Sequence, residues 1–220
     1  MTAGRCPGQD RRYWKPEDIF EEPCPHCGGA VEIWKYDVTL RCPHCRQVIT
    51  NPRFDPGCAA WCSYATKCLG EKALTYQRQP RVIRDKLEVE ARKRLFHHRD
   101  LLSTALKAAD FAEKISREEG VEPLVAVATC LFYDLGAATE NPDAPSLIRY
   151  LLANTGLEPE LAERIGKIVD AGNRPLEDPA WKVVQDARQL ARLAGPPPAG
   201  TTFHTRAAFR LAQQVKNPTD

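Results

Sequence analysis

Two copies of the tetrapeptide CPHC constrain the fold of this chain more than any other feature. The first copy contains Cys24 and Cys27, the second contains Cys42 and Cys45, and fourteen residues separate the two copies. Each Cys-x-x-Cys pair can wrap around a metal ion with backbone N–H groups directed at its thiolates. Four thiolates in tetrahedral geometry suit zinc, and such a closed site is structural because it leaves no position for water or substrate. The four cysteines therefore predict a structural zinc site.

The sequence around the two pairs predicts short β-strands. The stretch AVEIWKYDVTL, residues 30–40, is expected to supply the arms of a hairpin between the pairs. Together with the cysteines, this pattern over residues 22–50 resembles a zinc ribbon. We expect His26 and His44 to be exposed, since a histidine inside such a tight turn is poorly placed to bind the same ion.

The remaining cysteines predict a second metal site. The chain holds nine cysteines, and its opening decapeptide MTAGRCPGQD lacks the apolar core of a signal peptide, so metal binding is favoured over disulfides. Cys58 and Cys62 have i, i+4 spacing, Cys68 follows them, and Cys6 is the natural fourth ligand. Zinc, a [4Fe–4S] cluster and unligated buried thiols all remain open for this group. Cys130 lies in an apolar run and is expected to be a buried structural thiol.

From Arg81 onward the sequence has helical periodicity, and Gly or Pro residues separate its segments. The helices predicted beyond the first of these span residues 100–119, 123–135, 145–155, 158–171, 179–194 and 204–215. We therefore expect a mainly α protein. Its predicted parts are a cysteine-rich metal-binding module over residues 1–70, a connector helix over 71–99 and a helical bundle over 100–220.

The charge balance bears on partners and location. Lys and Arg number 31 against 29 Asp and Glu, which gives a formal net charge of +2. A chain so nearly neutral has no strong attraction for nucleic acid or for an anionic membrane. No apolar run is long enough to span a bilayer. These features predict a cytoplasmic protein that binds neither membranes nor nucleic acid.

Several helical stretches resemble the HD-domain superfamily of metal-dependent phosphohydrolases, namely ALKAADFAEKI, LVAVATCLFYDLG, VVQDARQLARL and FHTRAAFRLAQQV. With CPGQDRRYWKPEDIFEEPCPHCG and DPGCAAWCSYATKCLG ahead of them, nearly the whole chain is similar to bacterial proteins that join a zinc-ribbon, cysteine-rich module to an HD domain. The resemblance implies an HD-like helical bundle. In that superfamily a His, an adjacent His-Asp pair and a later Asp hold divalent metal, whose bound water attacks a phosphate ester.

This sequence departs from that ligand pattern. The resemblance places Thr104 at the first His, Tyr133 at the His of the pair and Arg188 at the late Asp. Only Asp134, the carboxylate of the pair, is retained. One carboxylate cannot hold a catalytic transition metal, and Arg188 would put a permanent cation where the metal's charge belongs. We expect Arg188 to form a salt bridge with Asp134, and we expect no catalytic residue at this degenerate site.

Three functional hypotheses follow from these residues. The first is a non-catalytic regulatory or accessory protein, whose N-terminal module contacts a protein partner and whose emptied pocket holds a nucleotide or another phosphorylated metabolite. The second is a divergent phosphohydrolase with a metal site rebuilt from His97, His98, Asp100, Asp134 or Asp186. The third is an accessory subunit of a redox complex, which requires the second cysteine group to hold an iron–sulfur cluster.

Overall fold

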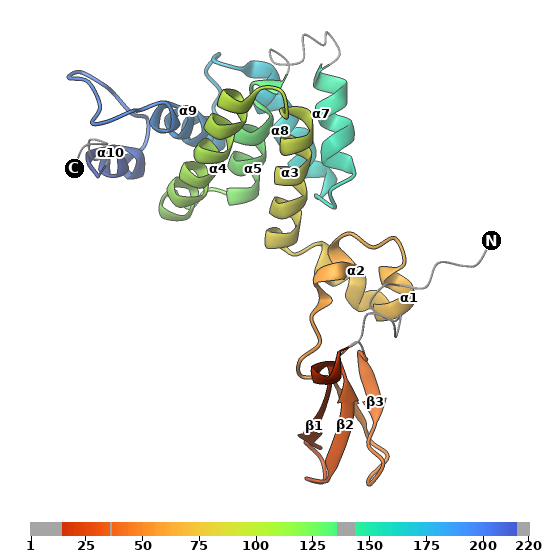
Figure 1. Ribbon diagram of the computed structural model, residues 1–220. Helices are drawn as coiled ribbons and strands as arrows, with labels where there is room; N and C mark the ends of the chain where they lie inside the picture. Colours follow the sequence, from red (N-terminus) through yellow and green to blue (C-terminus); the bar gives the residue numbers. More distant parts are fainter. Residues whose placement is uncertain (1–14, 36, 136–143, 215–220) are drawn as a thin grey trace. The chain divides into compact units, whose positions relative to one another are not determined.

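The structure is a computed structural model that describes residues 15–35, 37–135 and 144–214, without the side chains of Cys68 and Ala144. The chain divides into two compact units, residues 1–77 and residues 78–220. The described part of the chain is mainly helical, as the sequence predicts, and its strands all lie in the first unit (Figure 1).

Each cysteine pair forms the turn of its own antiparallel hairpin. β1 (Ile19–Pro23) pairs with β2 (Ala30–Trp34), and β3 (Thr39–Arg41) pairs with β4 (Val48–Thr50). The prediction that residues 30–40 supply both arms of one hairpin is wrong, because β2 and β3 belong to different sheets. The physical reason is that each Cys-x-x-Cys turn reverses the chain, so the strands on either side of it become neighbours.

A short 3-10 helix, η3 (Pro16–Asp18), precedes β1, and a small apolar core joins the two hairpins. Alternate residues of β2 face this core, as expected for a strand with one buried face. The buried members of the core are Cys24, Val31, Ile33, Cys42 and Ile49. Because two of the five are cysteines of the CPHC turns, the core and the cysteine site form one structure.

Asn51 fixes the loop between the two hairpins. Its side chain is buried, with the residue only 3% exposed, and its amide nitrogen donates to three backbone carbonyls. These belong to Trp34 and Lys35, both at 3.1 Å, and Asp37, at 2.8 Å. Its side-chain oxygen accepts from the Arg53 N–H at 2.8 Å. One side chain therefore connects the backbone on both sides of the loop.

Short helices complete the first unit. η4 (Pro56–Ala60), α1 (Ala65–Leu69) and α2 (Glu71–Gln77) pack around buried Ala59, Ala65 and Ala73. The span expected to form one connector helix over 71–99 contains two helices, since α2 ends at Gln77 and α3 begins at Pro80. Gln79 is extended, with ψ 136°. The proline ring clashes with a helical conformation of the residue before it. This clash at Gln79 is the physical reason why α2 and α3 are separate helices.

The second unit is a helical bundle with its own core. Proline occupies the first turn of several of its helices, where its missing N–H costs no hydrogen bond. The described helices are α3 (Pro80–Arg94), α4 (Arg99–Glu119), α5 (Pro123–Phe132), α7 (Ala144–Ala153), α8 (Pro159–Ala171), α9 (Pro179–Ala191) and α10 (Arg206–Gln213).

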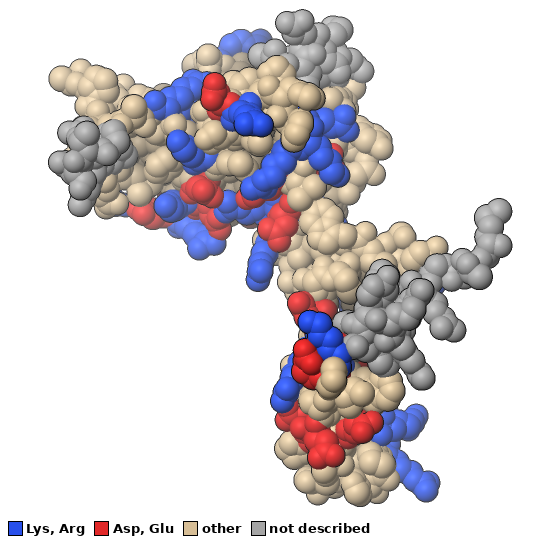
Figure 2. Space-filling model, in the orientation of Figure 1, with Lys and Arg blue, Asp and Glu red and all other residues tan. Residues whose placement is uncertain are grey.

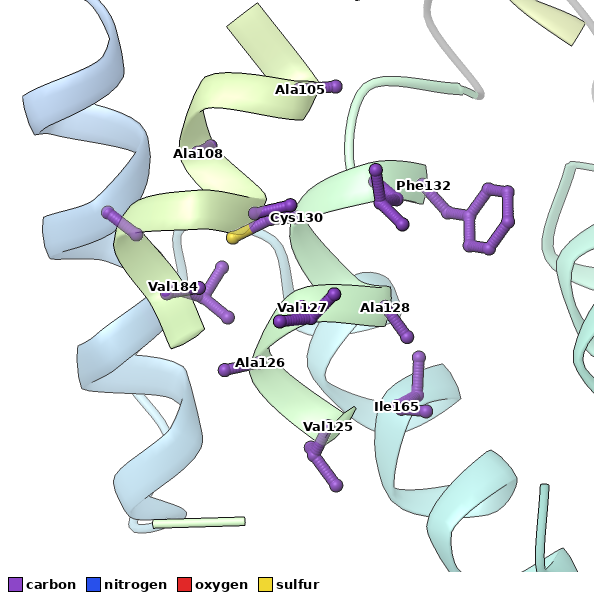
Figure 3. Close-up of a cluster of buried hydrophobic side chains, with 14 of the residues drawn as sticks. Ala105, Ala108, Val125, Ala126, Val127, Ala128, Cys130, Phe132, Ile165 and Val184 are labelled. Carbon is purple, nitrogen blue, oxygen red and sulfur yellow. The ribbon is translucent and has the colours of Figure 1, made fainter. Parts of the chain in front are cut away.

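Helix α5 is the centre of this bundle. Every residue from Leu124 to Phe132 is buried, and α3, α4, α8 and α9 all contact the helix. Figure 3 shows its apolar side chains pointing outward in several directions toward neighbours such as Ala108, Ile165 and Val184. A helix that is apolar on all sides must be covered on all sides, and α5 places the partly buried Tyr133 and Asp134 directly at its end.

Charged side chains of both signs lie on the outside of the helical unit. Lys or Arg and Asp or Glu are interspersed over its visible face (Figure 2). Arg84 of α3, for example, pairs with Glu88 at 3.0 Å, with Asp110 of α4 at 2.5 Å and with Glu113 of α4. Within the described residues, no helix has the length and apolar character needed to cross a membrane.

Candidate functional site

The four cysteines of the two CPHC turns meet in the first unit. Their sulfurs all lie within 4.8 Å of one another, with 3.8 Å between Cys24 and Cys45 and 3.7 Å between Cys27 and Cys42. A disulfide would require an S–S distance of about 2.0 Å. Across residues 15–35, 37–135 and 144–214, this is the only group of three or more His, Cys, Asp or Glu side chains close enough to hold a metal ion. The group could bind zinc or an iron–sulfur cluster.

Backbone N–H groups of the turns point at these sulfurs. The His26 N–H donates to the Cys24 sulfur at 3.4 Å. At Cys42, the N–H groups of Cys45 and His44 donate to the thiolate and lower the pKa of Cys42 to about 6. At Cys45, the Gln47 N–H acts in the same direction, but burial and the three neighbouring thiols outweigh it and raise the pKa of Cys45 to about 12. Four thiolates crowded together repel one another, so a bound cation is what lets all four ionise together.

The two histidines of the CPHC turns are exposed, as the sequence predicts. A ring nitrogen of His44, Nε2, lies 3.2 Å from the Ala30 carbonyl oxygen. The His44 ring also covers Gly29, where an added Cβ would lie only 2.5 Å from the ring atom Cδ2. A larger residue at position 29 would therefore force the His44 ring to move away from this turn.

The second group of cysteines is described in part. The Cys62 N–H donates to the Cys58 carbonyl at 3.0 Å, and the Tyr64 N–H donates to the Cys62 sulfur at 3.4 Å. The backbone of Cys68 lies in α1, while its side chain and the whole of Cys6 lie outside the described residues. The predicted assembly of these four cysteines therefore stays a prediction.

In the helical unit, Tyr133, Asp134 and Arg188 lie together. The Arg188 guanidinium donates to an Asp134 carboxylate oxygen at 2.7 Å, so the expected ion pair is confirmed. The same guanidinium lies 3.4 Å from the centre of the Tyr133 ring, in cation–π contact. The Arg188 side chain is 8% exposed, and Arg192 approaches the second Asp134 oxygen at 3.7 Å. Asp134 thus faces two arginines.

The Tyr133 hydroxyl belongs to a network of neutral polar groups. It donates to the Asn173 side-chain oxygen at 2.9 Å and accepts from the Gln185 amide at 3.2 Å. Gln185 and the Trp181 indole N–H both donate to the Gly172 carbonyl, at 3.2 and 2.9 Å. These bonds hold the ring in place beneath Arg188.

The fourth position carried over from the superfamily, Thr104, is half-buried on α4. Among the described residues, its side chain makes no hydrogen bond to Tyr133, Asp134 or Arg188. The structure therefore brings together three of the four predicted positions by direct contact.

Asp186 acts as a structural cap. Its carboxylate accepts from the backbone N–H groups of His204 and Thr205, at 2.9 and 2.8 Å, and from the Thr205 hydroxyl at 2.7 Å. Burial raises the pKa of Asp186, although these hydrogen bonds act against the shift. Thr205 in turn caps α10. Asp186 therefore anchors the start of the last helix.

The residues proposed for a rebuilt metal site are not gathered together. His97, His98 and Asp100 are exposed at the start of α4, and His97 contacts the Phe96 ring edge-on at a centroid distance of 5.1 Å. Within the described ranges, no three of these residues with Asp134 or Asp186 come close enough to share an ion.

Cys130 is buried, as expected, among apolar side chains of the bundle (Figure 3). Burial raises the pKa of the Cys130 thiol to about 12. A thiol that stays protonated is a weak nucleophile, so Cys130 is a packing residue.

A cavity of about 480 Å³ lies beside Arg188. Its walls carry two guanidinium groups, a histidine and several amides, and the lining residues are Asn173, Gln185, Arg188, Gln189, Arg192, Leu193, Pro198, Thr201 and His204. The Nε of Arg188 is buried and has no hydrogen-bond partner among the described residues. The cavity thus combines hydrogen-bond donors with positive charge, and no carboxylate lies among its lining residues.

Two groups that organise these sites were not predicted from the sequence, namely Asn51 in the first unit and Asn173 with Gln185 beside Tyr133. Their bonds join residues far apart in the chain, so no local pattern could indicate them.

No family model, curated protein or solved structure matches this chain.

Proposed function

We propose that this chain is a non-catalytic metal-binding protein with a regulatory or accessory role. In this account its first unit is a zinc ribbon. Its second unit is an HD-like bundle that has lost its metal ligands and now binds a phosphorylated ligand in the cavity beside Arg188. The observation that carries the proposal is the placement of Arg188, stacked on Tyr133 and paired with Asp134.

The sulfur separations support zinc in the first unit. A regular tetrahedron with metal–sulfur bonds of about 2.3 Å has edges of about 3.8 Å. The distances of 3.8 Å for Cys24–Cys45 and 3.7 Å for Cys27–Cys42 match those edges. An iron–sulfur cluster would place several iron and sulfide atoms between the thiolates and hold them farther apart.

The environment of Asp134 supports loss of metal chemistry in the second unit. A guanidinium is charged at every physiological pH, and the one on Arg188 is already bonded to this carboxylate. A divalent cation at Asp134 would have to displace the Arg188 guanidinium from this carboxylate. The cation would then lie beside that guanidinium without other anionic ligands. Removing the partner of a buried charge costs several kcal/mol, about 3–5 in well-studied cases, so the arginine excludes the metal.

The cavity composition supports an anionic ligand. Arg188 and Arg192 together carry two positive charges against the single negative charge of Asp134. Guanidinium groups bind phosphate oxygens in pairs, and Arg192 is 56% exposed and accessible to a ligand. The cavity volume of about 480 Å³ lies in the range of small-molecule sites.

Exposed apolar side chains support a protein partner for the first unit. Trp61, Tyr64 and Leu74 are 56%, 57% and 47% exposed, respectively. Large aromatic residues are enriched at protein–protein interfaces relative to other surfaces. Like charges lie opposite each other at Glu21 and Glu32 of the β1–β2 hairpin, which disfavours contact of that surface with a nucleic acid.

A thermal-shift titration with inorganic phosphate and nucleoside monophosphates tests the proposed function. Ligand at about 100 times its dissociation constant should stabilise the protein by about 2.7 kcal/mol. Arg192→Gln should abolish this stabilisation while leaving the Arg188–Asp134 pair intact. Arg210→Gln is the matched control, because Arg210 is a similarly exposed arginine that pairs with Glu118 outside the cavity.

Three results would contradict the proposal. The first is the absence of any shift with these compounds, and the second is a shift that Arg192→Gln and Arg210→Gln reduce equally. The third is metal-dependent hydrolysis of a phosphate ester that Asp134→Ala abolishes.

A further inference from the structure

The walls of the cavity beside Arg188 come mainly from two parts of the chain. One is a face of α9 and its C-cap, where the lining residues fall at i, i+3, i+4 and i+7, as neighbours on a helix do. These residues are Gln185, Arg188, Gln189 and Arg192. The other is the segment before α10, which contributes Leu193, Pro198, Thr201 and His204. Of this second wall, only His204 can gain a positive charge near neutral pH.

The backbone of His204 is fixed, whereas its ring is available to a ligand. The His204 N–H donates to the Asp186 carboxylate at 2.9 Å, and Thr205 makes two further bonds to the same carboxylate. The His204 ring is exposed and lies 5.3 Å, centroid to centroid, from the Trp181 indole. Among the described residues, neither of its ring nitrogens has a hydrogen-bond partner. The ring is thus held at the cavity wall with both nitrogens unused.

The charges around the cavity suit a ligand with two negative charges when His204 is protonated. The guanidinium groups of Arg188 and Arg192, set against the Asp134 carboxylate, leave one positive charge. The other lining residues apart from His204 are uncharged. Asp186 lies behind His204, where three hydrogen bonds already compensate its carboxylate. A phosphate monoester carries about −1.5 to −2 at pH 7, so a protonated His204 balances its second charge.

The accessible donors match the oxygens of a terminal phosphate. Arg188 is bonded to Asp134 and stacked on Tyr133, so Arg192, which is 56% exposed, is the guanidinium that a ligand can reach. His204 lies on the opposite wall of the cavity from α9 in the chain and supplies a second donor when protonated. A monoester offers three terminal oxygens to such donors. A diester has two terminal oxygens and a single charge.

We propose that this cavity selects a phosphate monoester in its doubly charged form, and that His204 determines this preference. The inference rests on the proposed function, because it concerns the same cavity. Arg192 and His204 donate to the phosphate oxygens, and the imidazole takes up one proton from solvent as the dianion binds. A phosphodiester, with one negative charge, binds more weakly and without that proton.

Sulfate is the probe that separates the charge of the protein from that of the ligand. Sulfate stays doubly charged between about pH 5 and 8, the interval in which histidine changes its charge. Calorimetric titration of the full-length, tag-free chain should show its affinity falling by about tenfold per pH unit at the alkaline end, the slope for uptake of one proton. His204→Gln should bind sulfate without this pH dependence. The variant keeps the bond to Asp186, because the donor is a backbone N–H.

His98→Gln is the matched control, since His98 is an exposed histidine at the start of α4 whose side chain does not cap the helix. It should behave as the wild type does. Methyl phosphate and dimethyl phosphate compare a monoester with a diester, and at pH 7 we expect the diester to bind about tenfold more weakly to the wild type. In His204→Gln this difference should shrink.

The outcomes distinguish failure of this inference from failure of the proposed function. Sulfate affinity that does not depend on pH, or that His204→Gln and His98→Gln change equally, would overturn the role of His204 and leave the phosphate site standing. Equal affinity for methyl and dimethyl phosphate would do the same. No binding of sulfate, inorganic phosphate or methyl phosphate at any pH would overturn both.

Nuclear magnetic resonance of the wild type gives a readout that does not depend on variant folding. The chain has five histidines, and the imidazole C–H resonance of each reports its own titration. Sulfate should move the titration midpoint of one histidine to higher pH, and that resonance should be the one missing from His204→Gln. Bound sulfate that moves none of the five midpoints would overturn the inference.

Discussion

At the scale of single residues, a few polar side chains determine how this protein is organised. Asn51 bonds to backbone groups of residues 14 to 17 positions earlier in the chain. Arg188 likewise joins residues more than fifty positions apart, since it pairs with Asp134. Asn51 bonds to four backbone groups, and Arg188 combines its ion pair with a cation–π contact to Tyr133, so each side chain connects segments that are distant in the sequence.

The Asn51→Asp variant tests the first of these residues. A carboxylate would face three carbonyl oxygens with no proton to donate, so we expect a loss of about 2–3 kcal/mol from the free energy of unfolding of the first unit. Denaturant titration followed by tryptophan fluorescence measures it. Asn154→Asp is the control, because Asn154 is exposed and its amide makes one bond, to the Tyr150 carbonyl. Equal effects of the two substitutions would contradict the role assigned to Asn51.

Arg46 and Gly28 occupy equivalent positions in the two CPHC turns, with φ of 61° and 75°. Left-handed backbone costs an ordinary residue about 1–2 kcal/mol. We expect Arg46→Gly to stabilise the first unit by about 0.5 kcal/mol, since the extra freedom of glycine in the unfolded chain offsets part of the gain. Gly28→Ala should cost about 1 kcal/mol. Denaturation midpoints of the zinc-loaded protein would show opposite shifts, and shifts of the same sign would contradict the equivalence.

Residue types predicted the chemistry of this protein better than they predicted its contacts. The gathering of the CPHC cysteines and the exposure of His26 and His44 followed from residue type and spacing. The Arg188–Asp134 pair was expected only from the resemblance that placed both residues at one site. The contacts of Asn51 and Asn173 followed from neither, because the bonds of a loop asparagine are not indicated by its type or spacing. The burial of Asn51 is decided by carbonyls that only the folded chain brings near, and the bond of the exposed Asn173 by the Tyr133 hydroxyl forty positions earlier.

At the scale of elements, helices were easier to predict than strand pairing. The helix expected over 100–119 spans Arg99–Glu119 and ends at Gly120, whose φ is 67°. Glycine and proline mark such ends locally. Strand pairing depends on which segments meet, and residues 30–40 could not indicate that their two halves pair with different partners.

The Asp186→Asn variant tests the connection between α9 and α10. An amide cannot accept all three hydrogen bonds, so we expect a loss of about 1–3 kcal/mol in unfolding free energy at neutral pH. Hydrogen exchange should increase at His204 and Thr205. Asp110→Asn, at an exposed carboxylate of α4, is the control.

The same variant has a predicted pH dependence. Burial raises the pKa of Asp186 in the folded protein above its ordinary value of 3.8, so the folded state holds this proton more tightly than the unfolded state. The contribution of Asp186 is therefore greatest below pH 3.8 and falls as pH rises through the folded pKa. The stability difference between wild type and Asp186→Asn should decrease over that interval, and an increase would contradict the shift.

At the scale of the whole molecule, the two units rely on different sources of stability. The first has a small core built around cysteines, whereas the second buries a long series of apolar helix residues. Chelation of metal should therefore abolish hydrogen-exchange protection across β1 to β4 and leave α4 and α5 protected. Readdition of zinc should restore the strands. Loss of protection in both units together would contradict this division.

We propose that this protein binds metal through its cysteines and not through the carboxylate of the helical unit. Metal content of full-length protein purified without oxygen tests that claim most directly, in the wild type and in the Asp134→Ala and Cys24→Ser/Cys27→Ser variants. We predict that Asp134→Ala keeps every metal ion of the wild type and that the cysteine variant loses one zinc. Loss of a metal ion in Asp134→Ala, with the cysteine variant unchanged, would contradict it.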